Sequence, residues 1–264
     1  MDQTSHVKSA LAHLEKLQEN NGSFRSVTNK YDKNGKLRGR EKHTTIFYSA
    51  IVLASLNCIY RTASLSKKYC DGEIQEKIKR MREKIARFLL LERSGDWTFN
   101  YWTRGSAESK QMPYPNDLDD TALVLRTLVE YKQELVPPEA LACFTRALVC
   151  AEKSPGGPYY TWLVLKENAN FKNDIDPVIN GNILRFLRAI KVEMPELSKF
   201  VESELKEGRL KSPYYNERWL PMYLMFGAKD LNEQNHAAKG EDNVPLIVER
   251  ICKGFVYIKA IVRH

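Results

Sequence analysis

The sequence predicts an all-α protein, and two observations carry this prediction. Apolar residues recur at helical spacing in nearly every long segment, whereas no convincing run of alternating polar and apolar residues indicates a strand. The chain of 264 residues is 43% hydrophobic and 28% charged, a mixture that can bury a sizeable core and disfavours disorder or a coiled coil. We expect a single domain over residues 1–264.

The helical periodicity extends along the whole chain. Residues 74–89 illustrate it, because an apolar stripe is interrupted there by Lys, Arg and Glu that would form a solvated face. Asp176 followed by Pro177 is typical of a helix start, with Asp as the N-cap and Pro at the first helical position. The predicted helices cover residues 7–17, 47–59, 74–89, 118–132, 138–152, 177–190, 195–207, 217–226 and 244–261.

A short motif follows several of these helices. Residues 18–24 have the form Gln-x-x-x-Gly-x-aromatic, and residues 91–97 repeat it with Leu in place of Gln. Looser copies occupy residues 153–160 and 206–215. Helical hairpins that repeat around a closed ring would bury each apolar face against the next hairpin.

The glycine of this motif can end a helix in the left-handed conformation, and the aromatic residue can fold back between neighbouring helices. We therefore expect Gly22, Gly95 and Gly157 at helix ends, with Phe24 and Trp97 packed between adjacent hairpins. The motif resembles the repeat of the squalene-cyclase and protein-prenyltransferase superfamily, whose domains are α/α toroids. The resemblance implies an α/α toroid, a ring of helical hairpins.

The most informative stretch is Pro-Asn-Asp-Leu-Asp-Asp-Thr-Ala at residues 115–122. Its three acids, Asp117, Asp119 and Asp120, could simply cap a helix and complement the helix dipole. Capping needs only one or two of them, however, and three crowded carboxylates repel one another. In a poorly solvated site they cannot all ionise, so one would remain a neutral acid able to donate a proton.

Asp-Leu-Asp-Asp-Thr-Ala is similar to the Asp-x-Asp-Asp-Thr-Ala motif of class II terpene cyclases. This resemblance implies that Asp119 is the general acid that protonates a terminal alkene or epoxide of a linear isoprenoid or prenylated small molecule. It makes Asp117 and Asp120 the neighbours that orient Asp119. No metal is required for that step, and Mg²⁺ is expected at most on a diphosphate tail.

Aromatic faces can stabilise a carbocation without attacking it, and polar groups at a helix entrance can line the mouth of a pocket. Each of these residues could equally belong to the core or to a helix cap. The expected substrate-binding residues are Trp97, Tyr101, Trp102, Tyr159, Trp162, Asp176 and Asn180.

The net charge of +8 comes from 41 Lys and Arg against 33 Asp and Glu, and the basic residues are scattered among acids, so no nucleic-acid partner is expected. Five cysteines without a Cys-x-x-Cys spacing argue against a disulfide framework and a zinc site. The N-terminus has no signal-peptide layout, and no apolar run approaches the roughly 20 residues that span a bilayer. We expect a cytoplasmic protein without a transmembrane segment.

Class II cyclases generally pair such a toroid with a second helical domain. The resemblance therefore implies that a partner chain or a second copy closes the cavity, that the substrate is small, or that the fold survives without catalysis. Two alternatives stay open. The chain could be a non-catalytic toroid that binds a prenyl lipid or a protein partner. It could also be an (α/α)-barrel enzyme that acts on carbohydrate with Asp residues as acid and base.

Overall fold

The computed structural model describes residues 3–65, 72–164, 172–209 and 212–215. The described residues belong to two compact units. Unit 1 takes its described residues from Met1–Glu92 and Trp102–Pro113, and unit 2 takes them from Arg93–Tyr101 and Tyr114–Gly240. The helices predicted over residues 217–226 and 244–261 lie outside the described residues.

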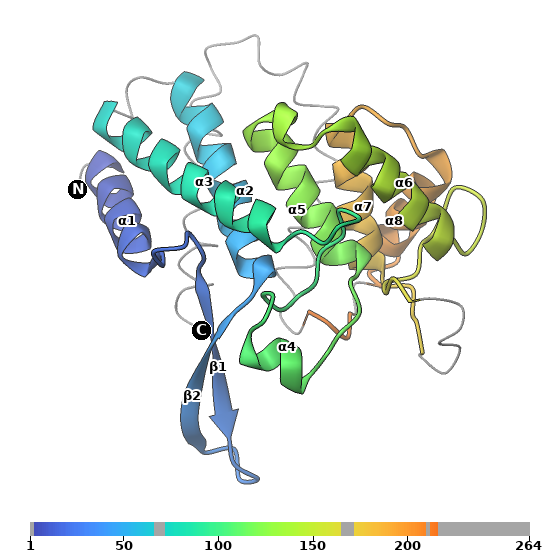
Figure 1. Ribbon diagram of the computed structural model, residues 1–264, viewed down its shortest axis with the longest axis horizontal. Helices are drawn as coiled ribbons and strands as arrows, with labels where there is room; N and C mark the ends of the chain where they lie inside the picture. The colour runs from blue at the N-terminus through green and yellow to red at the C-terminus, as the bar shows by residue number, and fades with distance from the viewer. Residues whose placement is uncertain (1–2, 66–71, 165–171, 210–211, 216–264) are drawn as a thin grey trace. The chain divides into compact units, whose positions relative to one another are not determined.

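Unit 1 is built on a packed pair of long helices. Its elements are α1 (Gln3–Leu17), β1 (Arg25–Tyr31), β2 (Leu37–Thr44), α2 (Ile46–Leu65), α3 (Gly72–Glu92) and α4 (Ala107–Gln111). α2 and α3 lie against each other, and α1 packs on α3 (Figure 1). α2 is apolar on most sides, whereas α3 buries one stripe that includes Ile78 and Ile85 and exposes its charged residues. The predicted helices of this region are therefore confirmed.

The prediction that every element is helical is wrong for the segment between α1 and α2. β1 and β2 form an antiparallel hairpin with a register that runs from Arg25 opposite Thr44 to Lys30 opposite Gly39. The strands carry Lys, Arg and Glu where a half-buried strand would carry apolar residues, so the expected period of two is missing. Asn34-Gly35, with Gly35 at φ +75°, is a typical hairpin turn and is the signal that indicates these strands.

Unit 2 contains two helices that are buried along most of their length and two that are buried on one side. Its elements are α5 (Leu118–Tyr131), the 3₁₀ turn η1 (Gln133–Leu135), α6 (Pro138–Ala151), α7 (Pro177–Ala189) and α8 (Pro195–Lys206). α5 and α7 pack side by side (Figure 1). α5 is buried on all faces over residues 118–128, and α7 is buried on all faces over residues 178–187. α6 and α8 bury a single stripe each. This part of the chain is helical as predicted.

The first copy of the repeated motif has the predicted conformation. Gly22 lies in the turn after α1 at φ +95°, and a Cβ atom there would stand 2.2 Å from the carbonyl oxygen of Lys84. Gln18 donates from Nε2 to the carbonyl oxygens of Gly22 (3.2 Å) and Met81 (3.1 Å), which explains the amide of the motif. Phe24 is buried, as expected of the aromatic position.

The second copy differs from the first. Gly95 does not take a positive φ, and Trp97 does so instead at +58°. The Trp97 ring is half-exposed beneath the guanidinium of Arg93, 5.1 Å from the ring centre, while Phe99 is fully buried. The expected packing of Trp97 between hairpins is thus wrong, because the alternation of the loop turns Phe99 rather than Trp97 into the core. In the third copy Gly157 has a φ of +101°, and Tyr159 is buried beside it.

Across the described parts of the chain, none of the helices combines the length and the apolarity needed to cross a bilayer.

Candidate active site

The three aspartates of the acidic motif all lie in unit 2, in or next to the first turn of α5. Asp117 is the N-cap, and its Oδ1 accepts the N–H of Asp120 at 2.8 Å. The residues are nonetheless almost inaccessible, with exposed fractions of 3% for Asp117, 8% for Asp119 and 3% for Asp120. Capping accounts for Asp117 alone and leaves two buried carboxyl groups unexplained.

Neighbouring loops hold this turn of α5 in place. Asp117 donates its N–H to the carbonyl oxygen of Phe99 at 3.2 Å, and Leu118 donates to that of Thr161 at 2.9 Å. The hydroxyl of Thr121 donates to the carbonyl of Asp117 at 2.5 Å and accepts the N–H of Phe99 at 3.0 Å. The Asp-Asp-Thr sequence therefore fixes the backbone beneath the acids as well as supplying them.

Asp119 is held by two side chains from distant parts of the chain. Nδ2 of Asn182, on α7, donates to Oδ1 of Asp119 at 2.7 Å. The hydroxyl of Tyr215, which follows α8, donates to the other carboxyl oxygen, Oδ2. Both oxygens of Asp119 thus have a fixed partner, whereas the buried Oδ1 of Asp120 has no hydrogen-bond partner in the described part of the chain.

Burial raises the pKa of all three carboxyl groups. The pKa of Asp117 rises to about 8, first through burial and then through the charge of Asp119. Burial raises the pKa of Asp119 to about 6, and the hydrogen bonds from Tyr215 and Asn182 limit this rise. Burial, followed by the charges of Asp117 and Asp119, places the pKa of Asp120 well above its ordinary value. At neutral pH the cluster therefore keeps at least one proton.

Two other predicted site residues form the start of α7. Oδ1 of Asp176 caps the helix by accepting from Val178 N (2.7 Å) and Ile179 N (3.1 Å). Asn180 accepts the N–H of Tyr159 at 2.8 Å and donates to the Tyr159 carbonyl at 3.0 Å. These two hydrogen bonds hold the side chain of Asn180 against the backbone of Tyr159. The charge of Asp176 also contributes to the raised pKa of Asp119, which brings that carboxyl group into the same electrostatic cluster.

The remaining predicted aromatics belong to both units. The backbone of Trp162 forms an isolated β-bridge with that of Asp117. The centre of the Trp162 ring lies 5.7 Å from the ring centres of both Tyr114 and Tyr214. Trp97 is half-exposed and Tyr101 partly so, both in unit 2. Trp102 is buried in unit 1. Tyr159 and Trp162 lie in one loop that supports the start of α5, and Trp97 and Tyr101 flank Phe99 in the other.

A surface pocket of about 250 Å³ lies beside Trp162 in unit 2. Its wall includes Arg146 of α6, Tyr160, Trp162 and Asn173. The lining residues do not include the three aspartates of α5, so this pocket does not give access to them.

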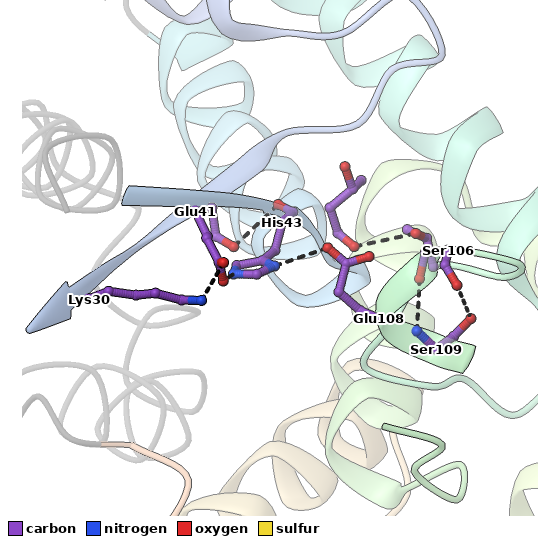
Figure 2. A network of polar contacts seen from close by, with 9 residues as sticks. Lys30, Glu41, His43, Ser106, Glu108 and Ser109 are labelled. Carbon is purple, nitrogen blue, oxygen red and sulfur yellow. Dashed lines mark hydrogen bonds and ion pairs between the residues drawn. The ribbon is translucent and has the colours of Figure 1, made fainter. Parts of the chain in front are cut away.

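A separate polar network occupies unit 1. Figure 2 shows His43 of β2 between Glu41 and Glu108, with His43 Nδ1 at 3.0 Å from Glu108 Oε1 and Nε2 at 3.7 Å from Glu41 Oε2. The Trp102 ring lies 5.9 Å from the imidazole. The hydrogen bond from His43 lowers the pKa of Glu108. This network ties the hairpin to α4, which gives His43 a structural explanation.

Among the described residues, no group of three His, Cys, Asp or Glu side chains is arranged to hold a metal ion. Comparison of the chain with models of protein families, with curated proteins and with solved structures finds no match.

Proposed function

We propose that this protein is an isoprenoid cyclase of the class II, proton-initiated type. The observation that carries the proposal is the burial of Asp117, Asp119 and Asp120 side by side, which raises the pKa of each carboxyl group. Proton donation to a weakly basic alkene needs an acid that is neutral, desolvated and fixed in direction. A surface helix cap needs none of these properties.

In this proposal the protonated form of Asp119 gives the proton. With a pKa of about 6 this form is the minority at neutral pH, whereas Asp117, with a pKa of about 8, keeps its own proton there. Oδ1 of Asp119 accepts a hydrogen bond from Asn182 and Oδ2 accepts one from Tyr215, so the transferable proton resides on a remaining lone pair of one of these oxygens. Transfer to a terminal alkene forms a C–H bond and leaves a carboxylate and a carbocation, which the π electrons of the next alkene attack to close a ring. Loss of a proton from the last cation ends the reaction, and solvent restores the proton of Asp119. Hydrogen bonds from Asn182 and Tyr215 stabilise the carboxylate that forms.

We also propose that the helices are part of an α/α toroid. The support is in unit 2, where α5 and α7 begin side by side. Thr161 lies between their starts: its carbonyl oxygen accepts the N–H of Leu118, and its N–H donates to the carbonyl oxygen of Asp174, both at 2.9 Å. α6 and α8 bury one face only, as the outer helices of such a ring do. An experimental structure in which the helices of both units do not form a ring would overturn this part.

The remaining features of the proposal follow from the chemistry. The first bond change needs no metal, and Mg²⁺ would serve only to hold a diphosphate tail. A partner chain or a second copy would close the cavity, which size-exclusion chromatography with and without substrate can test. We assign the protein to the cytoplasm because its odd number of cysteines suits a reducing compartment; cell fractionation tests this assignment.

The deciding experiment is incubation with a panel of linear prenyl diphosphates, prenylated aromatics and squalene-type epoxides, without and with Mg²⁺, followed by mass spectrometry. We expect a cyclised isomer of one substrate, formed without Mg²⁺ and absent with the Asp119→Asn variant. A glycan panel run in parallel separates the carbohydrate alternative. Hydrolysis of a glycan without any isoprenoid product would refute the cyclase.

A further inference from the structure

A second buried charge lies on the helix that carries the aspartates. Arg126 of α5 is 2% exposed, and its Nε and Nη2 atoms have no hydrogen-bond partner among the residues that the structure describes. A guanidinium group remains protonated at all physiological pH values, so this side chain is an internal cation.

An unpaired internal cation is unfavourable. Taking a charge out of water costs several kcal/mol unless an opposite charge and hydrogen bonds replace the lost hydration. Arg25, Arg38 and Arg87 form ion pairs at exposed positions, where water also solvates the guanidinium group. Arg126 differs from them in having burial without a carboxylate partner among the described residues. The N–H groups of these two buried nitrogens therefore have no acceptor among the residues that the structure describes.

The position of Arg126 relates it to the acid. It follows Asp119 by seven residues, nearly two full helical turns, so both side chains lie on the same face of α5. On α7, Asn182 contacts Asp119, and Arg185 lies one turn further along the same side. The neighbouring faces of the two parallel helices thus present an acid at one end and basic groups further along.

We propose that Arg126 binds an oxyanion of the substrate, so that the ligand of this site is a linear isoprenoid with a phosphate or diphosphate group. A guanidinium presents paired donors that match phosphate oxygens, and two of the Arg126 nitrogens are open for this purpose. The positive net charge of the chain favours the approach of such an anion. The identity of the hydrocarbon part rests on the proposed cyclase activity, whereas the anion site does not.

The test measures anion binding without turnover. Isothermal titration and thermal unfolding of the full chain are carried out with inorganic diphosphate, and with acetate as a weaker oxyanion, at constant ionic strength. We expect diphosphate to bind the wild type and raise its melting temperature more than acetate does. Arg126→Met, which keeps the length of the side chain but removes its charge and donors, should weaken diphosphate binding at least ten-fold. Arg87→Met, at an exposed arginine of α3, is the control and should bind as the wild type does.

The free protein gives a second readout. If Arg126 is an unfilled anion site, Arg126→Met without ligand should be at least as stable as the wild type, because an unpaired buried charge is removed. A purely structural arginine would instead lower the stability when replaced. Arg126→Lys keeps the charge but loses the paired donors, so its diphosphate binding should also fall, and it serves where Arg126→Met does not fold.

Three results would overturn the site: no diphosphate binding by the wild type, unchanged binding by Arg126→Met or Arg126→Lys, or loss of binding in Arg87→Met. These results are separable from the failure of the proposed function. Diphosphate binding that depends on Arg126, without any cyclised product, would leave the anion site in place and refute only the cyclase.

Discussion

The three aspartates of α5 share one turn but differ in what surrounds each carboxyl group. Asp117 is tied to the backbone as a cap, and Asp119 is tied to Asn182 and Tyr215. Asp120 has one buried oxygen without a partner in the described chain. Hydrogen-bond donors to a carboxylate favour ionisation of the carboxyl group, and burial without such donors opposes it. The group with two side-chain donors is therefore the one whose charge is best tolerated after it has given up a proton.

This difference predicts unequal effects of removing each carboxyl group. Asp119→Asn keeps the shape but removes the transferable proton, so it should lower kcat by a factor of about 10²–10⁴ while leaving substrate binding nearly unchanged. Asp117→Asn and Asp120→Asn change orientation and pKa rather than remove the donor, so each should lower kcat less. Single-turnover rates and equilibrium binding of the substrate found in the panel measure both quantities. Undiminished turnover in Asp119→Asn would end this mechanism.

Tyr215 offers a test of the electrostatics around Asp119. Its hydrogen bond favours the ionised carboxylate and so holds down the pKa of Asp119, which burial has raised to about 6. Because the active acid is protonated, the rate should fall as pH rises through this pKa. Tyr215→Phe removes the hydrogen bond and should move this alkaline limb to higher pH.

Tyr214→Phe is the control for that experiment. The hydroxyl of Tyr214 donates to Asp174 Oδ1 at 2.6 Å and accepts from Trp162 Nε1 at 2.9 Å. The pH profile of Tyr214→Phe should therefore match the wild type. An alkaline limb that stays in place or moves to lower pH in Tyr215→Phe would contradict the assignment of this hydrogen bond to the acid.

The acids themselves could be predicted from the sequence because they are adjacent in the chain. Their partners could not, because Asn182 is 63 residues from Asp119 and Tyr215 is 96 residues away. Packing of α7 on α5 brings Asn182 to the acid, and no local spacing encodes that packing. Arg126 is equally hidden, since an arginine within a helical pattern ordinarily indicates a solvated face.

At the scale of elements, apolar periodicity predicts the helices, whereas single residues predict the turns. The periodic pattern predicts α2, α3 and α5 to α8 because each buries an apolar stripe or is buried all round. The β1–β2 hairpin buries little, so its sequence is free of the pattern and its turn residues alone indicate it. Gly22 is a different case, because both its backbone conformation and its surroundings require glycine.

Gly22→Ala should destabilise unit 1 by more than about 2 kcal/mol. The added Cβ would meet the carbonyl oxygen of Lys84 at 2.2 Å in addition to the strain of a positive φ. Gly35→Ala is the matched control, since Gly35 has a φ of +75° with no atom within 4 Å of an added Cβ. It carries only the conformational cost, about 1 kcal/mol. Chemical denaturation compares the two variants, and equal losses would show that the contact with Lys84 yields without cost.

At the scale of the whole molecule, two sets of carboxyl groups respond to pH in opposite directions. In one set burial is the main influence and raises the pKa; it comprises Asp117, Asp119, Asp120, Asp176 and Glu92. In the other set hydrogen bonds to neighbouring groups lower the pKa; it includes Glu15, Asp32 and Glu108. The second set affects stability only at acidic pH, where its members take up protons. The first set dominates from mildly acidic to neutral pH.

The stability of the protein should therefore fall as pH rises from about 4 to about 8. The folded chain keeps the proton of Asp117 up to a pKa of about 8, whereas the unfolded chain releases it near the ordinary value of 3.8. Because the folded state binds one more proton than the unfolded state in this range, Asp117 lowers the free energy of unfolding by about 1.4 kcal/mol per pH unit. Asp117→Asn, which is neutral at every pH, should flatten the decline. Asp32→Asn, in the exposed hairpin turn, should leave the slope between pH 5 and 8 unchanged. Urea denaturation at unit steps of pH measures the slopes, and a wild-type stability that rises toward pH 8 would show that the buried aspartates are ionised in the folded protein.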